Sequence, residues 1–585
     1  MSGILSWRRA IRTGVGLGFA VAIAIFGAPA DLAGQVPSQP QTAIPQAVPV
    51  AASNGMVVTQ EARAAHIGVD ILQHGGNAVD AAVAVGFALA VSYPRAGNVG
   101  GGGFMVIHLA SGRDTAIDYR ETAPAAINAK SFLDDQGNAD PEKSRTSALA
   151  IGVPGTVAGL ALAEKEYGSG HFTLADLIAP AIAMARDGIT LDDEMTNEQT
   201  NILARLAHWP ASAKIFLKAD GSGLSAGDRL VQSDLANTLE SIARDGPDAF
   251  YQGPIAWKIA AAVQSAGGVM TVDDLKDYRA VERAPVRGSY RGYDIVSMPP
   301  PSSGGVELLE MLNILEGYDL AHDDQTQTSF LMIEAMKRAY ADRALFLGDP
   351  ETVNVPVGKL TSKSYAAMLR AGIDPEHATP ASAVRAGGSS DPEGHNTTHY
   401  SVADRFGNAV SNTYTLNFSY GVGLVADGTG ILLNNELDDF SAKPNSPNAY
   451  GLIGFEANEP GPGKRPVSSM TPTIVLKDGK PFLVTGSPGG SRITTAVLQV
   501  IVNVIDRGMN IADAVAAPRV HNQWQPDQVF AEPTVPPDVV AALQARGDKV
   551  VPQRPFTSAE SILITPEGFV GAADPRSQGA LAVGY

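Results

Sequence analysis

Cysteine is absent from all 585 residues of this chain, which excludes disulfides, thiolate metal sites and cysteine nucleophiles. Positive charge is also scarce, because the sequence has 43 Lys and Arg residues but 61 Asp and Glu residues, which gives a net charge of −18. A surplus of acid of this size argues against nucleic acid and anionic membranes as partners. It is typical of a soluble protein that takes small ligands.

Signatures of metal and nucleotide chemistry are missing as well. The ten histidines form no His-Glu-x-x-His motif, so we expect no bound metal. The glycine run Gly100–Gly103 is not followed by Lys-Ser or Lys-Thr, so it is not a phosphate loop. We therefore expect no metal and no cofactor.

The first fifty residues differ from the rest in composition. Three arginines within the first twelve residues precede an apolar run over Val15–Phe26, and Ala28-Pro29-Ala30 follows. This is the layout of a secretory signal peptide over residues 1–30, because the run is shorter than the about 20 apolar residues of a membrane span. An uncleaved anchor is the alternative. Residues 31–50 hold four prolines, which predicts an extended leader. We therefore expect a periplasmic or secreted protein.

A tight hairpin is predicted around Phe406, and it brings two threonines together. Residues 404–408 form the turn, in which Gly407 can take positive φ, and β-branched and aromatic residues flank it on both sides. Thr397 and Thr415 lie equally far from Phe406, so they face each other across the strands. Cross-strand neighbours have Cβ atoms about 5 Å apart, which lets one hydroxyl bond and orient the other.

A threonine hydroxyl is a poor nucleophile unless a base lies beside it. If the chain were cut before Thr397, the new α-amine, with a pKa near ~7.7, could accept the hydroxyl proton. One residue would then supply both nucleophile and base. The simpler interpretation, in which Thr397-Thr398 only begins a strand, stays open at this point.

Apolar spacing predicts buried helices in the first part of the chain. Residues 60–93 have helical spacing that two glycines break, with the second helix starting at Asn77 or Asp80. Residues 156–350 are expected to alternate helices with loops, and 330–346 to form a long amphipathic helix.

Strands are expected on both sides of these helices. They are predicted over 104–109 and 114–119, in the hairpin around Phe406, and in a second hairpin around Asp478-Gly479 that precedes a helix over about 491–505. This order predicts sheet packed on sheet with helices outside, a four-layer α/β/β/α sandwich of the α+β class. No repeat or linker follows residue 50, so the remainder should form one intertwined globule.

Three further features could bind or stabilise a charged substrate. Gly489-Gly490 would place backbone N–H groups at a helix N-terminus, where they could hold an oxyanion or simply make a turn. Arg120, at the end of a predicted strand, could clamp a carboxylate or form a surface salt bridge. Glu436 and Asp439 could hold an ammonium or be ordinary loop charges. His399 is expected to be structural.

At its motifs the chain closely resembles the γ-glutamyltransferase family (γ-glutamyl transpeptidase, or glutathione hydrolase) of the N-terminal-nucleophile hydrolase superfamily. The resemblance runs from about Gly55 to Tyr585 and rests on the joint order of the motifs. They are Gly75-Gly76-Asn77-Ala78-Val79-Asp80-Ala81-Ala82, Gly100-Gly101-Gly102-Gly103-Phe104-Met105, Pro301-Ser302-Ser303-Gly304-Gly305, Thr397-Thr398-His399-Tyr400-Ser401, Leu433-Asn434-Asn435-Glu436-x-Asp438-Asp439-Phe440, Arg465-Pro466-x-Ser468-Ser469-Met470 and Ser487-Pro488-Gly489-Gly490. The resemblance implies the sandwich of that superfamily, built jointly by two autoproteolytic fragments.

The resemblance also implies a maturation step and a reaction at one residue. Thr397 matches the threonine whose hydroxyl attacks the preceding carbonyl, here that of Asn396. The cut gives a large subunit (51–396) and a small, catalytic subunit (397–585), which remain together as a heterodimer. Thr397 then accepts the glutamyl group of a γ-glutamyl amide such as glutathione and passes it to water or to an amino acid or peptide.

Matching positions imply roles for the other site residues. Thr415 is the hydroxyl that assists Thr397, and Gly489 and Gly490 form the oxyanion hole. The glutamyl α-carboxylate is bound by Arg120, Ser468 and Ser469. The α-ammonium is held by Asn417, Glu436 and Asp439. Tyr450 is the aromatic residue of a lid loop over residues 444–455.

Two alternative functions remain at this level. The first is a cephalosporin or glutaryl acylase of the same fold, since family membership does not fix the substrate. The joint presence of Arg120, Asp439 and Ser468-Ser469 favours a glutamyl donor, because a glutaryl group has no ammonium for Asp439. The second is a non-enzymatic periplasmic binding protein in which the glycine loops are only turns.

Overall fold

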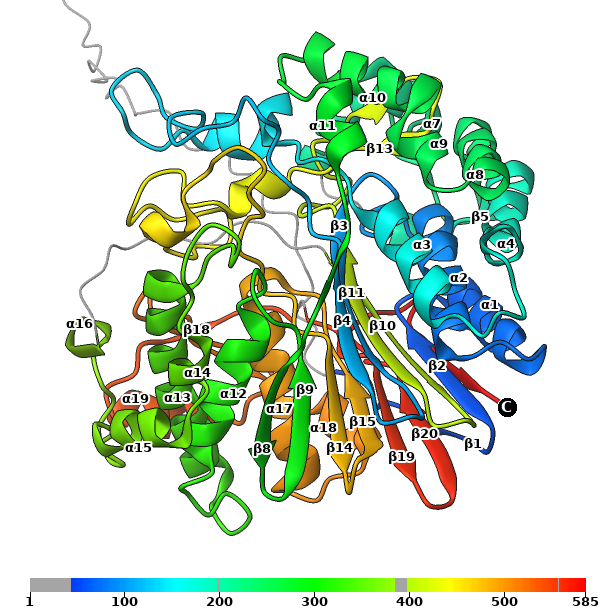
Figure 1. Ribbon diagram of the computed structural model, residues 1–585. Coiled ribbons are helices and arrows are strands. Elements are labelled where there is room, and N and C mark those ends of the chain that lie inside the picture. The colour runs from blue at the N-terminus through cyan, green and yellow to red at the C-terminus, as the bar shows by residue number, and fades with distance from the viewer. Residues whose placement is uncertain (1–43, 197–199, 385–396, 556) are drawn as a thin grey trace, which may run out of the picture. The chain divides into compact units, whose positions relative to one another are not determined.

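The computed structural model describes residues 44–196, 200–384, 397–555 and 557–585 (Figure 1). The predicted signal peptide, most of the leader and Asn396 lie outside the described residues. The described residues belong to one compact unit, Thr42–Tyr585. None of the helices in this described part combines the length and apolar character needed to cross a membrane.

Two seven-stranded antiparallel sheets form the centre of this unit (Figure 1). Sheet A has the order β1 (Val50–Ala52), β20 (Gly568–Ala572), β19 (Ser561–Thr565), β15 (Lys480–Thr485), β14 (Thr473–Lys477), β9 (Tyr293–Ser297) and β8 (Val286–Tyr290). Sheet B has the order β21 (Leu581–Gly584), β2 (Gly55–Thr59), β10 (Thr398–Asp404), β11 (Ala409–Thr415), β3 (Gly102–His108), β4 (Asp114–Asp118) and β7 (Val281–Arg283).

The two sheets pack face to face through apolar side chains. Phe104 and Val106 of sheet B meet Ile474, Val484 and Ile562 of sheet A in one buried cluster. These residues alternate along their strands with residues that point outward, as the two-residue period of a strand requires.

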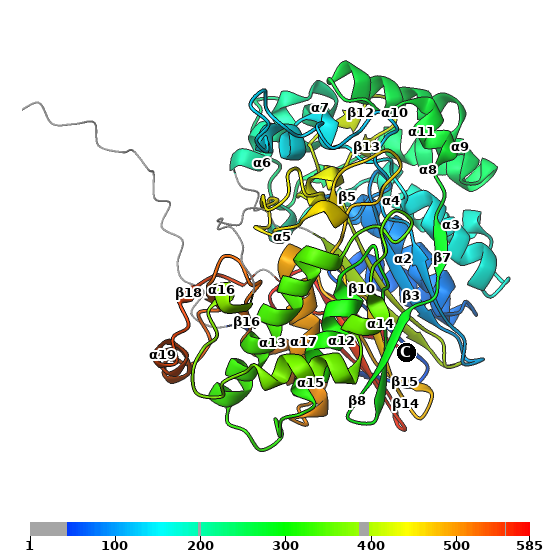
Figure 2. The ribbon, with the colours of Figure 1, turned by 60° about the vertical axis from the view of Figure 1, so that its left-hand side comes forward.

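Helices cover the outer face of each sheet, so the predicted four-layer α/β/β/α sandwich is confirmed. Next to sheet B lie α1 (Ala62–Gln73), α2 (Ala78–Ser92) and α3 (Thr156–Tyr167); α4 (Leu174–Asp187) packs outside α2, and α8 (Ser233–Asp245) packs on α4. α10 (Gly253–Ser265) belongs to the same apolar cluster but lies farther from the sheet. Sheet A is covered by α12 (Gly304–Leu315), α13 (Gln325–Phe346), α15 (Lys363–Ala371), α17 (Ile493–Ile505), α18 (Ile511–Ala516) and α19 (Pro537–Ala545). In Figure 2, α12, α13 and α17 lie side by side against sheet A.

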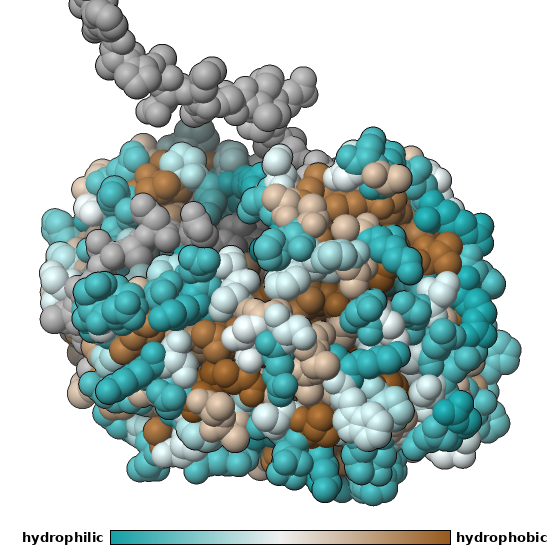
Figure 3. Space-filling view, turned by 90° about the horizontal axis from the view of Figure 1, so that it is seen from above, coloured by the Kyte–Doolittle hydropathy of each residue, from teal (hydrophilic) through white to brown (hydrophobic). Residues whose placement is uncertain are grey.

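The remaining elements are short. The helices are α5 (Asp193–Thr196), α6 (Thr200–His208), α7 (Pro210–Phe216), α9 (Asp248–Tyr251), α11 (Val272–Asp277), α14 (Val357–Leu360) and α16 (Ala381–Val384). The strands are β5 (Ile189–Thr190), β6 (Arg229–Leu230), β12 (Val425–Ala426), β13 (Ile431–Leu432), β16 (Val520–His521), β17 (Val529–Ala531) and β18 (Val550–Pro552). On the face shown in Figure 3, hydrophilic residues surround smaller groups of hydrophobic ones.

α2 shows why these residues form the layer next to sheet B. Every residue from Ala78 to Ser92 is buried, which fits a helix that is apolar on all sides. Its start is fixed by a capping box, since the Asn77 side chain accepts from the Asp80 N–H at 2.9 Å and Asp80 accepts from the Asn77 N–H at 2.9 Å. The helix then packs against β10 and β11, the hairpin of the two threonines.

Both sheets contain strands from before and after Thr397. In sheet B, β10, β11 and β21 follow the predicted cut, while β2, β3, β4 and β7 precede it. In sheet A, only β1, β8 and β9 precede it. Segments before and after Thr397 therefore share both sheets.

Two expectations need correction. Residues 156–350 hold more than helices and loops, because β8 and β9 form a hairpin whose turn residues Arg291 and Gly292 have φ of 52° and 84°. α13 begins at Gln325 and is buried from Thr328 to Ala344, so it is not amphipathic. Its charges are paired inside the protein; Lys337, for example, bonds Asp548 at 2.8 Å.

Candidate active site

The hairpin places Thr397 opposite Thr415. Thr398 pairs with Tyr414 and the register continues to Ala403 and Ala409 without a bulge, as the sequence predicted. Thr397, immediately before β10, donates from Oγ1 to Thr415 Oγ1 at 3.3 Å, and both side chains are buried. One hydroxyl can therefore orient the other.

Neighbouring groups fix Thr415 on both its backbone and its side chain. Asn98 donates to the Thr415 carbonyl at 2.9 Å, and the Asn417 N–H donates to Thr415 Oγ1 at 2.9 Å. A Cβ at Gly101 would lie 2.1 Å from the same carbonyl oxygen. The glycine at position 101 thus permits a close backbone approach to the β10–β11 hairpin.

Arg120 is the centre of a buried ion cluster. It is fully buried just after β4, its Nη1 pairs with Glu436 Oε1, and its Nη2 lies 2.5 Å from Asp439 Oδ2. Glu121 Oε2 is 3.9 Å from Nη1. The surface salt bridge considered for Arg120 is therefore wrong, and the guanidinium instead meets the two acids predicted to hold an ammonium.

Burial and mutual charge decide the protonation of this cluster. Burial raises the pKa of Glu436 to about 7, although Arg120 pulls it down, and burial likewise raises the pKa of Asp439. Burial alone would lower the pKa of Arg120, but the carboxylates of Glu436 and Asp439 raise it above the ordinary value. Burial raises the pKa of the neighbouring Asp438 to about 6. Negative groups outnumber the guanidinium, so the site favours a further cation.

Ser468 and Ser469 lie beside the cluster, on a segment that Arg120 helps to hold. Arg120 Nε donates to the Pro466 carbonyl at 3.1 Å. Ser468 Oγ accepts from the Met470 N–H at 3.1 Å. Ser469 Oγ is buried and has no hydrogen-bond partner within the described chain.

Two residues for which the sequence predicted no role, Ser303 and Arg343, also hold the segment that carries Ser468 and Ser469. Ser303, at the start of α12, donates to the Ser468 carbonyl from its N–H at 2.7 Å and from Oγ at 2.9 Å. Arg343 of α13 donates to Ser303 Oγ at 3.3 Å. The Pro301–Gly305 motif was visible in the sequence, but its contact with Ser468 spans 165 residues.

The Gly489-Gly490 loop adjoins the site, and Gly490 is among the residues that line the pocket around Thr397. Gly489 has φ 132° and Gly490 φ 54°, and neither N–H has an acceptor among the described residues. A short 3₁₀ turn, Gly490–Arg492, follows and leads into α17. A Cβ at Gly490 would lie 2.3 Å from Tyr450 Cδ1, so the Tyr450 ring sits directly beside the loop.

Asn417 and Tyr450 connect the hairpin to the lid loop, residues 444–455. The Tyr450 hydroxyl donates to the Asn417 carbonyl at 2.8 Å. Asn417 has φ 71° and its side-chain amide donates to the Asn435 carbonyl at 2.9 Å. His399 is structural, as expected: it bonds Thr413 and Ser401, and burial lowers its pKa to about 3.

One pocket collects these groups. Its lining residues are Thr397, Thr415, Asn417, Glu436, Asp439, Tyr450, Leu452, Ser468, Ser469, Met470, Gly490 and Ile493. Of the predicted site residues that the structure describes, Arg120 and Gly489 are outside this lining, although each directly adjoins a residue within it. The Thr397 hydroxyl, the Gly490 backbone and the carboxylates of Glu436 and Asp439 thus line one pocket.

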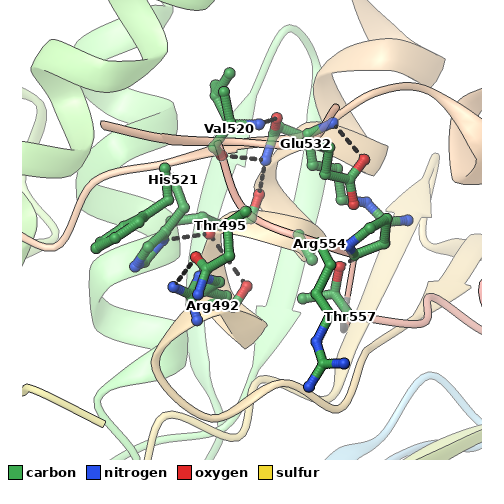
Figure 4. Close-up of a pocket in the computed structure, with 14 residues that line it drawn as sticks. Arg492, Thr495, Val520, His521, Glu532, Arg554 and Thr557 are labelled. Atoms are coloured by element: carbon green, nitrogen blue, oxygen red, sulfur yellow. Dashed lines mark hydrogen bonds between the residues drawn. The ribbon is translucent and has the colours of Figure 1, made fainter. Parts of the chain in front are cut away.

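A second pocket, lined by Arg492, Thr495, His521 and Thr557 among others, is shown in Figure 4. Thr557, in its lining, would lie 2.6 Å from a Cβ at Gly489. Its polar side chains bond one another: Thr495 Oγ1 and His521 Nδ1 are 2.9 Å apart, and Arg519 donates to Thr557 Oγ1 at 2.7 Å. These bonds support the start of α17 and therefore the loop before it.

Comparison with known proteins identifies the family. A family model described as Gamma-glutamyltranspeptidase matches residues 64–584. The chain belongs to the gamma-glutamyltranspeptidase family. A glutathione hydrolase proenzyme of Escherichia coli (strain K12) is 52% identical to this family member over 540 residues, which cover 92% of this chain and 93% of that protein. The predicted resemblance is confirmed, and the chain is an enzyme of the N-terminal-nucleophile hydrolase type.

Solved structures agree with this gamma-glutamyltranspeptidase assignment. A cephalosporin acylase from Bacillus halodurans superposes with a TM-score of 0.81 at 29% identity, covering 97% of this chain and 99% of that chain. A gamma-glutamyltranspeptidase from Helicobacter pylori superposes with a TM-score of 0.54 at 44% identity, covering 57% of this chain and 96% of that chain. Both support the sandwich fold of this family member.

Proposed function

We propose that the protein is a γ-glutamyl hydrolase and transpeptidase that cleaves γ-glutamyl amides such as glutathione through an ester on Thr397. The observation that carries the proposal is the pocket that joins the Thr397–Thr415 hydroxyl pair to Glu436 and Asp439, the two carboxylates that pair with Arg120 behind the lining. A γ-glutamyl group ends in an α-ammonium and an α-carboxylate. A site that binds it therefore needs carboxylates for the ammonium and a cationic side chain for the carboxylate, close to each other. The glutathione hydrolase name of the Escherichia coli relative points to the same substrate.

Two unsatisfied atoms support a zwitterionic ligand. Ser469 Oγ and Glu436 Oε2 are buried without a hydrogen-bond partner in the described structure, which is costly unless a ligand completes them. Ser469 can donate to the α-carboxylate, together with Arg120 and Ser468. Glu436 Oε2 can accept from the α-ammonium, next to Asp439 and Asn417.

The reaction follows from the positions of the other groups. Cleavage between Asn396 and Thr397 frees an α-amine that takes the proton of the Thr397 hydroxyl. The hydroxyl oxygen, oriented by Thr415, attacks the γ-carbonyl, and the negative oxygen that forms is bound by the N–H groups of Gly489 and Gly490. The amide bond breaks, the leaving amine takes the proton, and an ester remains on Thr397. Water or an amino acid or peptide then attacks the ester and regenerates the hydroxyl.

The same proposal covers processing and location. We expect residues 1–30 to act as a signal peptide, 31–50 as a leader, 51–396 as the large subunit and 397–585 as the small catalytic subunit, with the mature heterodimer in the periplasm or secreted. Val50 already belongs to β1. The solved Helicobacter pylori chain covers 57% of this chain, a share close to that of residues 51–396.

A same-fold acylase is the second candidate, because the cephalosporin acylase structure superposes over nearly the whole chain. Its glutaryl-type substrate would leave Asp439 and Glu436 without an ammonium, which argues against it.

The experiment combines intact mass and N-terminal sequencing of the mature protein with turnover of γ-glutamyl-p-nitroanilide and glutaryl-p-nitroanilide. We expect a fragment beginning at Thr397 and a strong preference for the γ-glutamyl compound. Preference for the glutaryl compound supports the acylase. An uncut chain without amidase activity would instead support the binding protein.

A further inference from the structure

Asn448 joins the acid cluster to the lid loop. Its side chain is 7% exposed, and both ends of its amide are used. Nδ2 donates to Asp439 Oδ1 at 2.9 Å, and Oδ1 accepts from the N–H groups of Tyr450 and Leu452, each at 3.0 Å. One buried amide thus connects the ammonium site to the turn that carries Tyr450.

The bond to Asp439 fixes how that carboxylate faces the cavity. Arg120 holds the other oxygen, Oδ2, at 2.5 Å. An ammonium that enters beside Oδ2 competes with Arg120, whereas the bond from Asn448 to Oδ1 is not displaced. Asn448 therefore keeps the Asp439 carboxylate oriented while the group bonded to Oδ2 changes from Arg120 to the ammonium.

The bonds to the turn fix how Tyr450 covers the oxyanion loop. The turn is closed by the Asn448 N–H, which donates to the Leu452 carbonyl at 3.0 Å. Gln523 donates to the Tyr450 carbonyl at 3.0 Å, and the ring lies against Gly490. A shift of Asn448 would move Tyr450 away from both Gly490 and the Asn417 carbonyl.

We propose that Asn448 is a positioning residue that couples recognition of the substrate's α-ammonium at Asp439 to the placement of the lid over the oxyanion loop. The inference rests on the proposed function and deepens it. A donor with an α-ammonium engages Asp439 and tightens the lid through Asn448. A glutaryl donor does not, so Asn448 contributes to selectivity for γ-glutamyl over glutaryl compounds.

The decisive variant is Asn448→Asp. It retains an oxygen acceptor for the Tyr450 and Leu452 N–H groups but places a carboxylate against Asp439 in place of a donor. We expect KM for γ-glutamyl-p-nitroanilide to rise about 10- to 100-fold, the loss of one hydrogen bond to a charged group, with kcat within about threefold because the turn is kept. KM for glutaryl-p-nitroanilide should stay within about twofold of wild type.

The matched control is Glu456→Gln, immediately after the lid loop. Glu456 is exposed and its side chain takes part in none of the bonds described here, so both constants should match wild type. If Asn448→Asp fails to fold, Asn448→Ala carries the test: it adds no charge, and it should raise KM by the same factor and also lower kcat.

A second readout does not depend on turnover. In the wild-type enzyme, added L-glutamate should slow hydrogen exchange at the Tyr450 and Leu452 amides, and glutarate should not. In Asn448→Asp the effect of glutamate should vanish. The coupling is refuted if glutamate slows exchange equally in both proteins, or if KM for the γ-glutamyl compound is unchanged. Lack of γ-glutamyl turnover in wild type would overturn the proposed function instead, and the exchange measurement would still decide the role of Asn448.

Discussion

Replacing Ser469 with alanine should separate stability from substrate binding. Ser469 Oγ is buried and lacks a hydrogen-bond partner in the described structure, so the folded protein bears the desolvation penalty of an unpaired hydroxyl, about 1–3 kcal/mol. Ser469→Ala removes that penalty. The urea midpoint of unfolding should therefore be unchanged or higher.

Binding should change in the opposite direction. A hydroxyl donor to the substrate's α-carboxylate is worth about 1.5–3 kcal/mol, so KM for γ-glutamyl-p-nitroanilide should rise about 10- to 100-fold. Steady-state kinetics on the processed enzyme measure this, with the subunit pattern on a denaturing gel as the check of maturation.

Ser468→Ala is the matched control for Ser469→Ala. Ser468 Oγ already accepts from the Met470 N–H, so its loss should lower stability by about 1 kcal/mol. A Ser469→Ala protein that is less stable than Ser468→Ala, or that binds donor as well as wild type, would falsify this account of the site.

Three other outcomes follow from the same geometry. Thr397→Ala should remain one chain on a denaturing gel and show no amidase activity; a cut, active variant contradicts the assignment. Thr415→Val removes the hydroxyl that lies 3.3 Å from the Thr397 hydroxyl and should lower kcat about 10- to 100-fold. An unchanged kcat in this variant would contradict the role given to Thr415. Because burial raises the pKa of Glu436 to about 7, its carboxylate forms as the pH rises, so KM should fall between about pH 6 and about pH 8. Since this folded-state pKa lies above the ordinary value of 4.5, the folded state holds the extra proton between these two values, so stability should fall as the pH rises from about 4.5 to about 7 and level off above that. Glu436→Gln should abolish the change in KM, and a retained pH dependence would place it on another group.

Local sequence was enough to predict the hairpin. The register of β10 and β11 is set by a short turn and by alternation that needs only the residues between Thr397 and Thr415. The helix break before α2 was equally local, since Asn77 and Asp80 cap it within three residues. Such features depend on neighbours in the chain, so a single sequence contains them.

Contacts between distant segments could not be worked out from local pattern. Arg120 meets Glu436 across 316 residues, and only the family resemblance placed them in one site. Even that resemblance did not predict that the three charged groups bond each other, because their pairing depends on burial. The β8–β9 hairpin was missed although Gly292 marked its turn, since the helices around it dominated the pattern.

Because both sheets combine strands from before and after Thr397, the two parts of the chain depend on each other for assembly. A backbone break before Thr397 would leave pieces that share both sheets, so neither piece could keep its hydrogen bonds alone. Separately produced halves would expose unpaired strand edges and aggregate. The cut before Thr397 therefore has to come after folding. The two resulting fragments need no covalent link to stay together, since separating them would require unfolding both sheets.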